Sequence, residues 1–128
     1  MKKGRKMIID ILALVFISMA LGSFGQVYIK MGLRNIGSFD LADIVTIKLV
    51  SVLTNKNVIL GLVFYGVATL LWFVVLAKSE LSYAYPLIGL SYAVTAILAR
   101  FYFNETISII RWVGIFAIIF GAFLITRS

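Results

Sequence analysis

The chain of 128 residues contains no cysteine and no histidine, and its single proline is Pro86. Without these two residue types there is no disulfide framework, no thiolate metal site and no imidazole acid or base. A catalytic site would have to rest on serine, tyrosine and lysine alone. The sequence therefore predicts no catalytic residues, no bound metal, no cofactor and no enzymatic activity.

Charge is also scarce, since only 13% of the residues are charged while 62% are hydrophobic. The 12 lysines and arginines outnumber the 5 acidic residues and give a net charge of +7. In a soluble protein this balance would suggest nucleic acid as a partner, but here the cations sit at the ends of apolar runs. We interpret them as contacts to anionic membrane lipids, and predict no nucleic-acid partner.

Four apolar runs are each close to the roughly 20 residues that a helix needs to cross about 30 Å of hydrocarbon. The last run reaches this length if the long side chain of Arg111 extends towards the headgroups. We predict an all-α membrane protein, a single domain over 1–128. Its expected transmembrane helices cover about 8–31, 57–78, 80–103 and 107–126.

The segment between the first and second of these helices has a different pattern. Over about 40–53, apolar residues recur at helical spacing, with Asp40, Asp43 and the head of Lys48 between them. This pattern predicts a short amphipathic helix that lies in the membrane interface.

The distribution of cations predicts a multi-pass protein of the cell (inner or plasma) membrane with both termini on one side. The count is balanced, because six cations fall on each side of the membrane. The four at Lys2, Lys3, Arg5 and Lys6 favour cytoplasmic termini. The balanced count also leaves open dual insertion and an antiparallel dimer.

Two helices carry polar groups that must be accommodated in lipid. Ser18, Gly22, Gln26 and Lys30 recur every four residues of the first helix, so this stripe should face protein, either as a contact between helices or as a substrate surface. In the third helix, Pro86 cannot donate to the carbonyl of Ser82, and free backbone is tolerated where it lines a cavity. We therefore mark Ser82, Tyr83, Tyr85 and Pro86 as a candidate site, against the alternative of a plain proline kink.

Alternating spans bring several charges to the same side of the membrane. The residues concerned are Lys30, Arg34, Arg100, Glu105 and Arg111. One carboxylate cannot balance four cations, so phosphates of lipids or of a ligand are the expected counter-ions, unless each cation simply extends to bulk headgroups.

The fourth helix has small residues on one face. Gly114, Ala117 and Gly121 stack at helical spacing, which predicts a contact seam within the chain or a packing surface in a dimer.

Several motifs together resemble the drug/metabolite transporter superfamily. They are Gly25-Gln26 with Lys30, Leu71-Trp72, the block Leu81-Ser82-Tyr83-Ala84-Tyr85-Pro86-Leu87 with Ser91, Asn104-Glu105, and Arg111-Trp112-Val113-Gly114. Within the superfamily the chain is most similar to the small four-helix EamA-like group that includes the subunits of the aminoarabinose-phosphoundecaprenol flippase. The likeness leaves out the segment 32–56.

The small multidrug resistance exporters are a sister group, and the glycine pair Gly114 and Gly121 matches their last helix. Those exporters depend on a membrane-embedded glutamate in the first helix, eight residues before the lysine that aligns with Lys30. Here Gly22 occupies that position. This departure argues against proton-coupled export of cationic solutes.

The resemblance implies a flippase for an undecaprenyl-phosphate-linked sugar or a similar amphiphile. Lys30, Arg34, Arg100 and Arg111 would hold the phosphate, and Gln26, Tyr83, Tyr85 and Ser91 would offer hydrogen bonds to the sugar. Four helices are too thin a bundle to enclose this path, so a homodimer or a pair with a similar small subunit is expected. An exporter of small cationic solutes and a non-transporting accessory subunit remain as alternatives.

Overall fold

A computed structural model describes residues 2–128, and within that range the chain is helical with no strand. Four helical segments in the described residues are long and apolar enough to cross a membrane, namely Gly4–Ile36, Lys56–Lys78, Leu81–Phe103 and Ile109–Thr126. Most of their large apolar side chains are exposed, as lipid-facing residues are. The prediction of an all-α, multi-pass membrane protein is confirmed.

The first helix, α1, covers Lys2–Ile36 and is longer at both ends than the expected 8–31. Its end is set by Gly37, which has a φ of 97° and whose N–H donates to the carbonyl of Leu33 at 3.1 Å. Glycine adopts this backbone conformation without a steric penalty, so Gly37 is a favourable residue for ending the helix.

The connecting segment differs from the single amphipathic helix expected over 40–53. It contains a short 3₁₀ helix, η1 (Leu41–Val45), and a separate α2 (Lys48–Leu53). Thr46 separates them in an extended conformation, because its hydroxyl donates to the carbonyl of Asp43 and accepts from the N–H of Lys48. These local side-chain bonds compete with a continuous helix.

The second span is α3 (Lys56–Lys78), which begins where the Asn55 side chain accepts from the backbone N–H groups of Asn57 and Val58. It packs along α1 with two glycines at the contact. A Cβ on Gly61 would lie 2.6 Å from the carbonyl oxygen of Gly25, and one on Gly25 would lie 2.8 Å from that of Gly61. The backbones of α1 and α3 therefore approach more closely here than any residue with a side chain would permit.

The third span is divided at the proline. The short α4 (Leu81–Leu87) is followed by α5 (Gly89–Phe103), where a single helix was expected over 80–103. Pro86 has no N–H to donate, and the next turn tightens, with the N–H of Ile88 bonded to Tyr85 and that of Ser91 bonded to Ile88.

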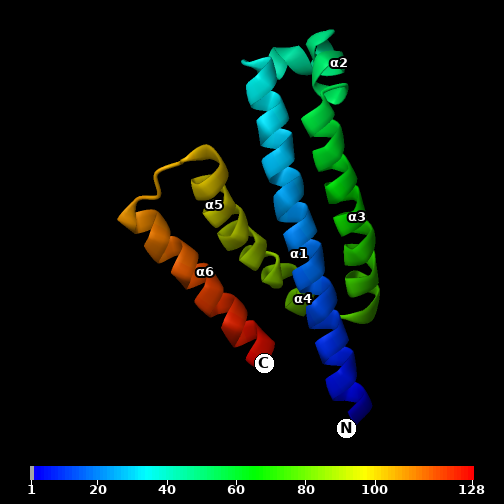
Figure 1. Ribbon diagram of the computed structural model, residues 1–128. Coiled ribbons are helices and arrows are strands. Elements are labelled where there is room, and N and C mark those ends of the chain that lie inside the picture. The colour runs from blue at the N-terminus through cyan, green and yellow to red at the C-terminus, as the bar shows by residue number, and fades with distance from the viewer. Residues whose placement is uncertain (1) are drawn as a thin grey trace.

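The last helix, α6 (Ile109–Arg127), starts after Ser108, whose hydroxyl accepts from the N–H of Arg111 at 3.2 Å. Figure 1 shows α1 between α3 on one side and α4–α5 on the other, with α6 on the outer side of α5. The N-terminal end of α1 and the C-terminal end of α6 lie towards one end of the bundle, and α2 lies at the opposite end. This arrangement leaves a hollow over one face of α1.

Candidate functional site

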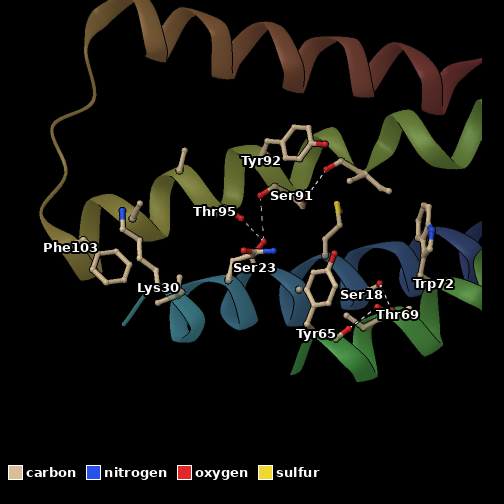
Figure 2. Close-up of a pocket in the computed structure, with 18 of the residues that line it drawn as sticks. Ser18, Ser23, Lys30, Tyr65, Thr69, Trp72, Ser91, Tyr92, Thr95 and Phe103 are labelled. Carbon is tan, nitrogen blue, oxygen red and sulfur yellow. Dashed lines mark hydrogen bonds between the residues drawn. The ribbon is translucent and has the colours of Figure 1, made fainter. Parts of the chain in front are cut away.

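A groove of about 940 Å³ runs along α1. Its floor is the face of α1 from Ser18 to Lys30, one wall is α3 from Tyr65 to Trp72, and the other wall is formed by α4 and α5. No described residue of α6 lines it. Figure 2 shows Trp72 towards one end of this groove and Lys30 beside Phe103 at the other.

Hydroxyl groups connect the helices in the middle of the groove. Thr95 Oγ1 donates to Ser23 Oγ at 3.0 Å, and Ser23 Oγ donates to the carbonyl of Ser91 at 3.4 Å, as the dashed lines in Figure 2 show. On the α3 side, the buried Ser18 hydroxyl donates to the carbonyl of Ala68 at 2.9 Å. In lipid these groups have no water to bond, so they stabilise the helix contacts and make this part of the groove polar.

Charge is concentrated at the end of the groove where α1 and α5 finish. Lys30 Nζ forms an ion pair with Glu105 Oε1, a residue of the loop between α5 and α6. Lys30 Nζ lies 5.0 Å, and the Arg34 guanidinium carbon 5.2 Å, from the ring centroid of Phe103. The Phe103 ring thus attracts both cations by cation–π interaction.

The loop geometry directs Glu105 to this position. Asn104 ends α5 in the left-handed conformation, with a φ of 52°, and Glu105 follows it at the start of the loop that leads to α6. The hydrogen bond from Lys30 holds the pKa of the Glu105 carboxyl below its usual range, helped by the charges of Lys30, Arg111 and Arg34 and opposed by partial desolvation. Glu105 is therefore ionised at neutral pH.

Six of the eleven substrate-binding candidates line this groove, together with Ser18 and Gly22 of the polar stripe: Gln26, Lys30, Trp72, Tyr85, Ser91 and Glu105. The other substrate-binding candidates, Ser82, Tyr83, Pro86, Arg100 and Arg111, lie outside its lining. Tyr83 packs against the buried cluster around Val75 and Leu87, and Arg111 directs its guanidinium to the carbonyl of Thr106 at 3.5 Å. The structure thus brings about half of the candidates together.

Sequence reasoning missed several residues of the groove: Ser23, Tyr65, Thr69, Tyr92, Thr95 and Phe103. A signal for some of them was present, because Tyr65, Thr69 and Trp72 recur on one face of an otherwise apolar helix. Ser91 and Thr95, four residues apart in α5, follow the same rule.

The small residues that were expected to form a contact seam, Gly114, Ala117 and Gly121, are not closely packed within the chain. Gly114 and Ala117 are exposed, and a Cβ built on Gly114 or Gly121 meets no described atom within 4 Å. The packing of α6 on α5 instead involves Gly89, whose Cβ would lie 3.1 Å from Ile118.

One known family matches almost the whole chain. The family model described as the EamA-like transporter family matches residues 1–127. The chain belongs to the EamA-like transporter family. It is therefore a multi-pass membrane protein of a transporter family, as its motifs indicated.

Several proteins that are similar to this EamA-like chain carry the name probable 4-amino-4-deoxy-L-arabinose-phosphoundecaprenol flippase subunit ArnE. The protein from Pseudomonas syringae pv. syringae is 30% identical over 73 residues, which are 57% of this chain and 68% of that protein. The protein from Pseudomonas fluorescens is 33% identical over 69 residues, 54% of this chain and 60% of its own length. The protein from Yersinia pseudotuberculosis serotype O:1b is 31% identical over 74 residues, 58% of this chain and 65% of its own. No solved structure gives a significant match.

Proposed function

We propose that this EamA-like protein is a flippase, not an enzyme, for an undecaprenyl-phosphate-linked sugar or a similar amphiphile. The observation that carries the proposal is the groove, which joins a polar middle to a cationic end. A phosphate would bind Lys30 and Arg34, and a sugar would bond to Ser23, Ser91 and Thr95. The names of the similar proteins support a substrate of this class.

The groove favours this reading over a proton-coupled exporter of small cations. Exporters of that kind resemble this chain but need a carboxylate in the first helix, where Gly22 lines the groove here. Glu105 is the acidic residue among the described lining residues, and it is already paired with Lys30 at the end of the groove. A cation entering the groove would meet hydroxyls and aromatic rings without an opposite charge.

We place the protein in the cell (inner or plasma) membrane, with both termini in the cytoplasm. The cluster Lys2, Lys3, Arg5 and Lys6 supports this orientation through the bias of basic residues to the cytoplasmic side. The Lys30 end of the groove would then face the opposite leaflet.

The flippase proposal is tested in liposomes that contain a fluorescent undecaprenyl-phosphate sugar, by following its accessibility to an impermeant quencher. Protein-dependent exchange is expected, and Tyr85→Ala should slow it about tenfold, because loss of a ring and a hydroxyl from the groove removes roughly 1.4 kcal/mol of binding. Tyr102→Ala is the matched control, since Tyr102 is similarly exposed but does not line the groove.

The outcomes separate the alternatives. Exchange that Tyr85→Ala slows and Tyr102→Ala does not would support the flippase and its site. No exchange by a correctly assembled protein would contradict the proposal and favour an exporter of cationic solutes or an accessory subunit.

We further propose that the protein acts as a homodimer, or as a pair with a similar small subunit, joined through α6. Gly114, Ala117 and Gly121 support this because they form a small-residue face that the chain itself leaves uncovered. Gly114→Leu and Gly121→Leu are expected to abolish the dimer while the monomer stays folded, since a Cβ added at either position meets no described atom within 4 Å. Cross-linking in membranes measures the dimer, with Gly66→Leu as the control on α3, where a Cβ likewise meets open space.

A further inference from the structure

The groove does not end at Lys30. A second hollow of about 460 Å³ continues along the same face of α1, lined by Leu33, Arg34 and Phe39 among others. Gln26 and Lys30 line both spaces. The ion pair of Lys30 with Glu105 therefore lies at the junction between the groove and the hollow near the end of the bundle.

The contacts at this junction divide into fixed and exchangeable ones. Phe103 is the last residue of α5, and its ring attracts both Lys30 and Arg34 without depending on the anion that either cation binds. Glu105 belongs to the loop of residues 104–108, which carries no helix, and its side chain remains 38% exposed. An exposed ion pair is weak, so other anions can compete with the carboxylate for the cation.

We propose that the Lys30–Glu105 ion pair is an exchangeable closure of the groove, which a phosphate group of the substrate opens by taking the place of the Glu105 carboxylate on Lys30. This inference rests on the proposed function, because it assigns the phosphate of that substrate to Lys30. The phosphate of such a substrate is esterified to both the lipid and the sugar, so it has two free oxygens, as the carboxylate has. It can bond to Lys30 and Arg34 together, whereas among the described residues the Glu105 carboxylate pairs with Lys30 alone, so the exchange favours the phosphate. In the absence of substrate, Glu105 neutralises Lys30 and keeps the junction shut.

The first test measures the closure without any substrate. The natural chain has no cysteine, so Ala96→Cys places a single thiol in the groove. In proteoliposomes, an impermeant maleimide is added outside the vesicles, and a parallel preparation that carries Ser38→Cys in place of Ala96→Cys measures the fraction of protein whose Lys30 end faces outward. Glu105→Gln should raise the rate of modification about fivefold, because an amide no longer pairs with Lys30.

The matched control is Asp43→Asn. It removes the carboxylate of the second ion pair, in which Lys48 Nζ lies 3.6 Å from Asp43 Oδ2, outside both spaces. Its rate of modification should equal that of the parent protein. An unchanged rate in Glu105→Gln, or an equal rise in both variants, would overturn the closure.

The second test measures binding of a short-chain polyprenyl phosphate to the purified protein by calorimetry, with the matching polyprenol as the uncharged control. Glu105→Gln should bind the phosphate about fivefold more tightly than the parent, because no carboxylate competes for Lys30. Weaker or equal binding by Glu105→Gln would overturn the exchange. If Glu105→Gln opens the groove but neither protein binds the phosphate, the closure stands, while its opening by phosphate and the proposed substrate class are both wrong.

Discussion

Lys30→Met lowers the rate of lipid-linked sugar exchange roughly a hundredfold. This loss corresponds to about 3 kcal/mol, which is the expected cost when a phosphate loses a hydrogen bond to a cation. Methionine keeps the length of the side chain and its contact with Phe103 but removes the charge. The measurement is the liposome exchange assay described above, with protein amounts matched by quantitative gel analysis.

Lys48→Met is the control for this prediction. Lys48 is also a lysine in an ion pair, but it lies in α2 and outside both hollows. We expect exchange by Lys48→Met to stay within about twofold of the parent, as for a surface charge far from the site. Equal losses in the two variants would show that Lys30 acts through general charge or insertion and not through the groove.

Gly61→Ala is expected to destabilise the folded protein by about 3 kcal/mol. The added Cβ would lie 2.6 Å from the carbonyl oxygen of Gly25 and 2.8 Å from the backbone nitrogen of Ile29, and backbone atoms cannot rotate away. The α1–α3 contact must therefore separate, which loses packing along the helix pair that forms the floor and one wall of the groove. Thermal unfolding in detergent, followed by circular dichroism, measures the effect.

Gly66→Ala in the same helix provides the comparison. A Cβ there meets no described atom within 4 Å, and alanine is the better helix former by about 1 kcal/mol, so this variant should be as stable as the parent or slightly more so. If the two variants unfold at the same temperature, the close approach of Gly25 and Gly61 does not control the stability of the bundle.

The local features of the chain could be predicted because they depend on near neighbours. Run length and hydrophobicity are sufficient to place the membrane spans, since each must satisfy its backbone within one helix. Pro86 was recognised as a residue whose missing N–H frees a backbone carbonyl, but a single helix was expected over 80–103, and its division into α4 and α5 was not predicted. The division of the connecting segment at Thr46 was not predicted, because the hydroxyl bonds of Thr46 compete with a continuous helix and apolar periodicity takes no account of them.

The residues that line the groove could be predicted only in part. Ser82 and Tyr85 stand three residues apart in α4, yet only Tyr85 lines the groove. Which of them does so depends on how α4 is rotated against α1 and α3, and this rotation follows from packing around the buried Ala84 and Leu87. Lys30 lines the groove and Arg100 does not, and their charges could not predict this difference, because it depends on how α1 and α5 are rotated in the bundle.

By itself, the sequence determined that this is a four-span membrane protein whose chain has neither cysteine nor histidine. Composition and periodicity express these properties directly. Only the tertiary structure decided that Lys30 meets Glu105 across 75 positions of the chain and that Ser23, Ser91 and Thr95 form one polar surface. The physical reason is that such meetings depend on where helices cross, and the crossings are set by close contacts such as Gly25 with Gly61.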